Sequence, residues 1–231
     1  MQPRSTVEAQ YGKHLEIRDR EGVTRLGVEK NGNWQTDPRR LVFVLSRYKF
    51  VSKMLSGRQS VLEVGCGDAW PVRLVLQEVA RLHAIDIDPI FVEDAKTGMT
   101  PRWPFTVAVH DMLSGPLPAA FDAAYSLDVI EHIPAEHEDA FVRNIADSLL
   151  PHGVLLVGMP SLESQQYASA LSKAGHVNCK SAHGWGTSFC YDECLESNIA
   201  HSEWIQHLAQ SVPKPPSRYP RPTNWPPPSS R

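Results

Sequence analysis

A glycine-rich turn follows a short apolar stretch in VLEVGCGDAW, residues 61–70. Gly65 and Gly67 fill the first two positions of a G-x-G-x-x-G pattern, whereas Trp70 stands at the third. Backbone amides in such turns normally hold phosphates. Glu63 precedes the turn, and its carboxylate would repel a pyrophosphate. The missing glycine and this acid therefore weaken a dinucleotide interpretation.

A positively charged ligand reverses this electrostatic argument. S-adenosylmethionine carries an ammonium and a sulfonium and no phosphate, so Glu63 could neutralise its amino-acid end while the glycines let the backbone approach. Asp86 ends the next apolar stretch, where an acid can accept hydrogen bonds from ribose hydroxyls. Asp111 ends the third, where it could accept from an adenine amino group, with Met112 packing on the ring. The sequence thus predicts S-adenosylmethionine as cofactor.

Candidate catalytic residues lie at and just after the end of a fourth apolar stretch, residues 121–128. Methyl transfer from a sulfonium needs alignment of the reactants, and a hydroxyl or protonated amine acceptor also needs a base. Asp128 and His132 are the candidates for that base, although His132 could equally cap a local turn. The expected acceptor-binding residues of the N-terminal region are Tyr11, His14, Arg18 and Trp34.

Strands and helices must alternate to bring these residues together. Apolar residues at helical spacing follow the first and fourth of these stretches, so the pattern predicts an α/β fold with a parallel, doubly wound sheet. The predicted strands are residues 60–64, 82–88, 104–111, 121–128 and 153–160.

Three regions differ in their patterning. Residues 1–36 are polar and are predicted to be an arm, with a turn at Asn31–Trp34. Residues 37–180 form the predicted domain, beginning with a helix that Asp37 caps and Pro38 starts. Residues 181–231 contain no convincing strand, and eight prolines fall in the last nineteen positions. Polyproline II or disorder is expected for this tail, and one hypothesis is an out-of-frame or replaced C-terminus.

Ligand-type residues also gather late in the chain. Zinc-site spacing is not matched and no C-x-x-C pair occurs, so we expect no metal site. The four cysteines fit a reducing compartment, and Cys66 is expected to be a small residue chosen for space. The late ligand-type residues are His176, Cys179, His183, Cys190 and Cys194.

Composition narrows the function classes. The chain has 231 residues, 42% of them hydrophobic, which is enough for one core. A net charge of −3 argues against a nucleic-acid partner, and no apolar run reaches the length of a membrane span. The N-terminus lacks the apolar core of a secretory signal. We expect a cytoplasmic protein with a small-molecule acceptor; the partner of the proline-rich tail is unknown.

Five motifs in order resemble those of class I S-adenosylmethionine-dependent methyltransferases over about residues 55–160. The wider region 11–180 resembles free-standing bacterial methyltransferases of unassigned or small-molecule substrate. The motifs are ExGxG at 63–67, AxDxDP at 84–89, HDM at 110–112, FDAAYSLDVIEHI at 121–133 and LLPHGVLLVGMPS at 149–161.

This resemblance implies roles for individual residues and a Rossmann-like, mostly parallel methyltransferase sheet. It places Asp86 at the ribose, Asp111 and Met112 at the adenine, and Leu127 and Asp128 beside the reacting centre. The family sheet ends in an antiparallel hairpin, which we expect this chain to lack. The residues implied at the methionine moiety are Glu63, Gly65, Cys66 and Gly67.

Three functions are compatible with the sequence. The expected one is methyl transfer from S-adenosylmethionine to a small-molecule or sugar-like acceptor by in-line displacement. The first alternative is a non-catalytic methyltransferase-like remnant, whose tail would engage an adaptor domain. The second is a nicotinamide-dependent oxidoreductase, which Trp70 and Glu63 disfavour.

Overall fold

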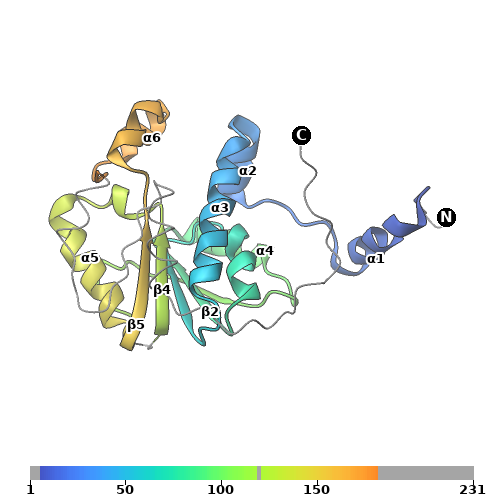
Figure 1. Cartoon of the computed structure of the whole chain (residues 1–231), viewed down its shortest axis with the longest axis horizontal. Helices are drawn as coiled ribbons and strands as arrows, with labels where there is room; N and C mark the ends of the chain where they lie inside the picture. The colour runs from blue at the N-terminus through green and yellow to red at the C-terminus, as the bar shows by residue number, and fades with distance from the viewer. Residues whose placement is uncertain (1–5, 119–120, 182–231) are drawn as a thin grey trace, which may run out of the picture. The chain divides into compact units, whose positions relative to one another are not determined.

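A computed structural model describes residues 6–118 and 121–181 (Figure 1). Five strands form one sheet in the order β3-β2-β1-β4-β5, and every described pair is parallel. The predicted doubly wound parallel sheet is confirmed. The strands are β1 Val61–Val64, β2 Leu82–Asp86, β3 Thr106–Val109, β4 Phe121–Leu127 and β5 Leu149–Gly158.

The strand order reverses beside β1. From β1 the chain moves outward to β2 and β3, and it then returns to place β4 on the other side of β1. Val64 pairs with Ile85 on one side and with Ser126 on the other, so the carboxyl ends of these strands lie together. Open α/β sheets bind ligands at such a reversal.

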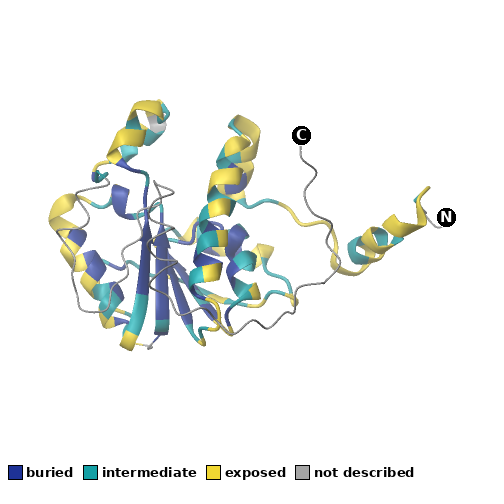
Figure 2. Ribbon diagram, viewed as in Figure 1, coloured by how far each residue is buried: buried dark blue, intermediate teal, exposed yellow. Residues whose placement is uncertain are grey.

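Alternate residues of the strands point to opposite faces, and each face has its own apolar core. On one face, Val61 and Ala84 pack with residues of α3 Arg39–Met54 and α4 Pro89–Gly98. On the other, Leu62 and Ile85 pack with α5 Ala135–Asp147. Figure 2 shows burial concentrated on the strands and on the helix faces turned toward them.

Local sequence explains the main helices. In α3, Leu41, Tyr48 and Val51 are buried at helical spacing, as predicted. The helix begins one residue later than expected, with Pro38 as its N-cap. Asp88 caps α4 by accepting a hydrogen bond from the Ile90 amide at 2.8 Å, which accounts for that acid structurally.

The N-terminal region contains two helices, α1 Gly12–Glu21 and α2 Val28–Thr36. The turn predicted at Asn31–Trp34 is wrong, because these residues continue α2. Gly32 and two asparagines are weak helix formers, but α2 is held by tertiary contacts: its Val28 amide donates to Asp94 of α4 at 2.7 Å.

Two further expectations need correction. The helix predicted after β1 is a 3-10 helix, Trp70–Gln77, which still buries Val72 and Val75. The fifth strand begins at Leu149 rather than at residue 153, because the chain continues pairing through an irregularity in register opposite Phe121 and Ala123.

The last described elements are a 3-10 helix at Leu162–Tyr167 and α6 Ala170–Gly175. The predictions for the proline-rich tail and for a missing hairpin concern residues that lie outside the described part of the chain. Among the described residues, no helix has both the length and the apolar character to span a membrane.

Candidate functional site

A cavity of about 520 Å³ lies at the carboxyl ends of β1, β2 and β4. It has the volume of a small-molecule site. The structure brings together in its wall all but one of the residues predicted for cofactor binding and catalysis. These lining residues are Gly65, Cys66, Gly67, Asp86, Asp111, Met112, Leu127, Asp128 and His132.

The glycine turn forms the floor beside β1. Gly65 and Gly67 have φ angles of +78° and +53°, a region that favours glycine. A Cβ on Gly65 would lie 2.2 Å from Val129, and one on Gly67 would lie 2.5 Å from a carboxylate oxygen of Glu29. Packing against Val129 thus requires a glycine at position 65, whereas at position 67 the positive φ is the main requirement because the Glu29 carboxylate ends a flexible side chain. Burial raises the pKa of the Cys66 thiol, which therefore stays protonated, in agreement with a space-filling role.

The strand-end acids are anchored by backbone amides. Asp86 accepts hydrogen bonds from the amides of Gly67 at 2.7 Å and Asp88 at 2.9 Å. Asp111 accepts from the Leu113 amide at 2.9 Å, and the side chain of Met112 is buried next to it. These contacts fix the carboxylates in orientation while leaving further lone pairs for hydroxyl or amino donors.

Glu63 is the predicted residue that does not line the cavity. Its side chain is 1% exposed and lies under α3, where the Tyr48 hydroxyl donates to Oε1 at 2.5 Å. Its other oxygen, Oε2, has no hydrogen-bond partner among the described residues. Burial raises the pKa of Glu63 to about 7, although Tyr48, Tyr125 and Lys30 favour the charged form. Glu63 therefore lies behind Tyr48, which lines the cavity, and not in the cavity wall itself.

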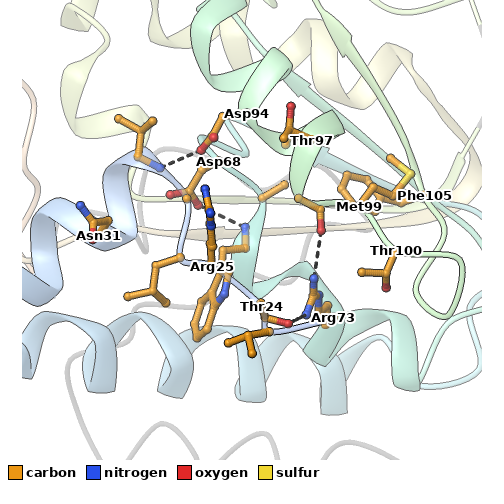
Figure 3. Close-up of a pocket in the computed structure, with 18 of the residues that line it drawn as sticks. Thr24, Arg25, Asn31, Asp68, Arg73, Asp94, Thr97, Met99, Thr100 and Phe105 are labelled. Carbon is orange, nitrogen blue, oxygen red and sulfur yellow. Dashed lines mark hydrogen bonds between the residues drawn. The ribbon is translucent and has the colours of Figure 1, made fainter. Parts of the chain in front are cut away.

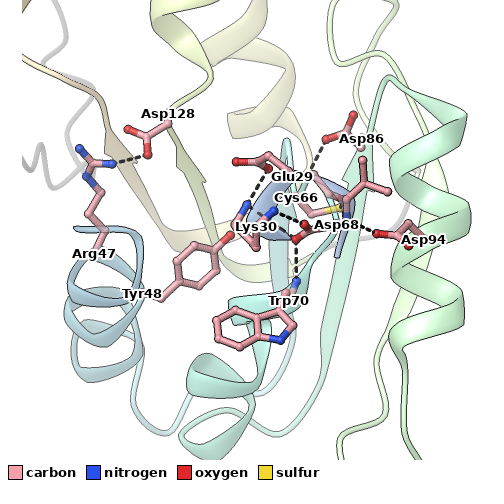
Figure 4. Close-up of polar contacts among 12 residues, drawn as sticks. Glu29, Lys30, Arg47, Tyr48, Cys66, Asp68, Trp70, Asp86, Asp94 and Asp128 are labelled. Atoms are coloured by element: carbon pink, nitrogen blue, oxygen red, sulfur yellow. Dashed lines mark hydrogen bonds and ion pairs between the residues drawn. The ribbon is translucent and has the colours of Figure 1, made fainter. Parts of the chain in front are cut away.

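Lys30 and Glu29 of α2 also line the cavity, and the sequence analysis missed both (Figure 4). The Lys30 ammonium is buried and lies 2.6 Å from Glu29 and 3.7 Å from Asp68. Burial alone would lower the pKa of Lys30, but these acids outweigh it and the pKa is raised. Asp68 also accepts from the Lys30 amide at 2.8 Å, so α2 is fastened to the glycine turn.

Asp128 stands at the opposite end of the cavity from the strand-end acids of β2 and β3. It adopts φ +57° and forms an ion pair with Arg47 of α3 (Figure 4). Burial raises the pKa of Asp128, and Arg47 opposes that effect. One carboxylate oxygen, Oδ1, has no hydrogen-bond partner among the described residues.

His132 lines the cavity near Asp128. Its Nδ1 lies 2.9 Å from the Gly175 carbonyl, and a carbonyl only accepts, so Nδ1 carries the proton. The neutral ring then presents a lone pair on Nε2. This hydrogen bond is a structural role for His132, and it leaves the other nitrogen free for chemistry.

A larger cavity of about 780 Å³ lies between the segment before α2 and α4 (Figure 3). The first turn of α2 separates the two: Val28 lines the larger cavity and Lys30 the smaller. The larger one lacks the acids that end β2 and β3, so the smaller is the candidate site. Tyr11, His14, Arg18 and Trp34, expected to bind the acceptor, are not among the residues that line either cavity.

The donor set of the smaller cavity fits S-adenosylmethionine. Among the described residues, four carboxylic side chains and one lysine line it. The acidic excess suits a cation and ribose hydroxyls, and Lys30 suits a carboxylate. Met112 and Phe91 provide apolar surface for a flat ring. The four acids are Glu29, Asp86, Asp111 and Asp128.

Comparison with known proteins agrees with this chemistry. A family model described as a methyltransferase domain matches residues 61–153. A probable S-adenosylmethionine-dependent methyltransferase of Mycolicibacterium smegmatis is 31% identical over 116 residues, which cover 49% of this chain and 42% of that protein. The chain thus spans less than half the length of this curated relative.

One solved structure shares the fold. The N-methyltransferase NodS from Bradyrhizobium japonicum has a TM-score of 0.50 at 20% identity, covering 61% of this chain and 76% of that one. The sugar N-methyltransferase KedS8 from a Streptoalloteichus species has a TM-score of 0.48 at 20% identity, covering 60% and 56%. The family match and the chemistry of the cavity together support a class I S-adenosylmethionine-dependent methyltransferase domain over residues 61–153, with S-adenosylmethionine as its cofactor.

Proposed function

We propose that this chain transfers the methyl group of S-adenosylmethionine to a small-molecule, sugar-like acceptor by in-line displacement. One observation carries the proposal: a single cavity is lined by the strand-end acids Asp86 and Asp111 and also by Asp128 and His132. The proposed cofactor-binding end and the proposed proton-accepting end would therefore share one cavity. The curated relative and NodS, each described as a methyltransferase, support the reaction class.

The cofactor-binding end uses groups of matched charge. Asp86 would accept from the ribose hydroxyls and Asp111 from the adenine amino group, with Met112 against the ring. Lys30 would bind the carboxylate of the methionine moiety, and Glu63 would favour its ammonium from beneath the turn. When bound, the sulfonium supplies an already activated methyl group, so these residues need only hold the cofactor in position.

The acceptor end uses groups that can take a proton. Asp128 is held by Arg47 and has one oxygen without a hydrogen-bond partner among the described residues, and His132 presents the Nε2 lone pair. Either group could remove a proton from an acceptor hydroxyl or ammonium as the methyl group moves. Leu127 and Val129 line the cavity beside Asp128 and help to exclude water.

The binding half of the proposal is tested by calorimetry with S-adenosylhomocysteine. We expect Asp86→Asn to weaken binding, because the carboxylate lines the cavity. Asp88→Asn is the matched control, since Asp88 lies two residues away and caps α4. Equal affinity of the two variants would contradict the role of Asp86.

The catalytic half is tested with methyl-labelled cofactor and a panel of amino and hydroxylated sugars and other small metabolites. Label in a small molecule supports the proposal, and label only in protein or RNA refutes it. Binding of the cofactor without turnover on any acceptor would instead favour a non-catalytic remnant. The cytoplasmic location and the N-terminal acceptor-binding residues remain predictions from the sequence.

A further inference from the structure

Three metal-ligand side chains meet beside the acceptor end of the cavity. Glu131 and His132 lie in a 3-10 helix, Ile130–His132, and His176 follows α6. One ligand atom from each of the three residues lies within 4.8 Å of the others. Figure 1 shows α6 at the end of the sheet where β5 finishes. These residues are distant in sequence and are brought together only by the fold.

The Glu131 carboxylate points to a missing positive partner. Its side chain is fully buried, and neither oxygen has a hydrogen-bond partner among the described residues. Buried carboxylates in native proteins are normally hydrogen-bonded, paired with a cation or coordinated to a metal. A metal ion between Glu131 and the two histidines would supply that partner.

Both histidines are oriented as metal ligands usually are. The Nδ1 of His132 donates to the Gly175 carbonyl at 2.9 Å, and Nδ1 of His176 lies 2.7 Å from Oε1 of Gln165. Each ring therefore has its proton on Nδ1 and its lone pair on Nε2. Histidine ligands commonly donate their second nitrogen to a carbonyl in this way, which fixes the tautomer and the ring orientation.

The backbone holds the cluster together independently of any ion. The amides of Val177 and Asn178 donate to the Glu131 carbonyl at 2.8 and 3.0 Å. The segment that carries His176 is thus fastened to the segment that carries Glu131. The ligand atoms are positioned before binding, so an ion would not have to order this region.

We propose that Glu131, His132 and His176 bind one divalent transition-metal ion of the Zn²⁺ class. Two imidazoles and a carboxylate suit Zn²⁺, Co²⁺ or Mn²⁺, whereas Mg²⁺ prefers oxygen ligands throughout. Three protein ligands leave at least one coordination position open. Because His132 lines the cavity, that position adjoins the acceptor end.

Ion binding and general-base catalysis exclude each other at His132. One Nε2 lone pair serves either a proton or a metal ion. With the ion bound, Asp128 is the remaining proton acceptor at this end of the cavity. The metal site does not depend on the proposed reaction, because ion binding is measured without cofactor or acceptor.

The test is a titration of the chelator-treated full chain with Co²⁺, followed by visible absorption. We expect one bound Co²⁺ per chain, displaced by Zn²⁺ and unaffected by Mg²⁺. Glu131→Gln and His176→Ala should abolish the absorption band or weaken binding at least tenfold, since loss of an outer-shell partner alone costs about 10–100-fold. Gln165→Leu, which removes the partner of His176 together with a 3.3 Å hydrogen bond to the Ser161 carbonyl, should weaken binding without removing a ligand.

Two controls make the outcome specific. His137→Ala changes an exposed histidine of α5 and should bind Co²⁺ like the parent chain. A Cys190→Ser, Cys194→Ser double variant should also retain the band. The proposal is overturned if the parent chain binds no Co²⁺, if folded His176→Ala keeps full affinity, or if the cysteine variant loses the ion.

Discussion

Replacing Glu63 by glutamine should change how stability depends on pH. Glu63 is buried beneath the glycine turn, and its pKa is raised from 4.5 to about 7, chiefly by burial. The folded chain therefore holds a proton that the unfolded chain releases near pH 4.5. The contribution of Glu63 to stability is present in full below pH 4.5 and is lost as pH rises through about 7.

The size of this effect follows from the two pKa values. At about 1.4 kcal/mol for each pH unit, the interval from 4.5 to about 7 corresponds to roughly 3 kcal/mol. Glutamine has nearly the same shape, stays neutral and can still accept from the Tyr48 hydroxyl. Glu63→Gln should therefore be close to the parent chain in stability at pH 4.5 and more stable by up to roughly 3 kcal/mol at pH 8.

Urea denaturation of both chains at several pH values between 4.5 and 8 measures this difference. Other titrating groups cancel, because only the difference between the variant and the parent is compared. Glu93→Gln, on the exposed side of α4, is the matched control and should show a constant difference. A constant difference for Glu63→Gln as well would refute the conclusion that burial holds this carboxyl neutral.

Three further predictions concern the cavity. Gly67→Ala should lower the free energy of unfolding by about 1–3 kcal/mol, because φ at this position is +53°. Gly32→Ala in the middle of α2 should raise the free energy of unfolding by about 0.5–1 kcal/mol, and thermal denaturation distinguishes the two variants. A double-mutant cycle that changes Arg47 and Asp128 to alanine should give a coupling of about 1 kcal/mol in unfolding free energy, because the ion pair is partly exposed. If the effects of the two substitutions are additive, the ion pair contributes nothing to stability. Binding of S-adenosylhomocysteine near neutral pH should release a proton from Glu63, because the ligand ammonium lowers the pKa of Glu63. Calorimetry in buffers of different ionisation enthalpy measures this proton release, and Glu63→Gln should abolish it.

The sequence was sufficient to predict the sheet and nine of the residues that line the cavity. Strand-end residues such as Asp86, Asp111 and Asp128 could be placed because parallel strands all end at one edge of a sheet. Alternating strand and helix patterns fix that edge from local information alone. Gly65 and Gly67 could be identified for a similar reason, since a strand followed directly by a tight turn demands positive φ values.

The part of the cavity wall that α2 forms could not be predicted from the sequence. Lys30 and Glu29 lie in a polar region whose composition predicts an arm and a turn. Contacts with Asp68 and Asp94, far along the chain, hold α2 in place and override its weak helix propensity. The one available signal was the amino-acid carboxylate of the predicted cofactor, which calls for a basic partner that the strand ends do not supply.

Thus the sequence by itself determined the strand segments, their parallel sheet, the glycine turn and the acids at the strand ends, because these depend on periodicity and local backbone geometry. Only the tertiary structure decided that Glu63 lies under Tyr48 rather than in the cavity wall. It alone placed Lys30 against the glycine turn and His176 against Glu131. These contacts join segments distant along the chain, and which distant side chains meet is set by how the whole core packs rather than by any local pattern.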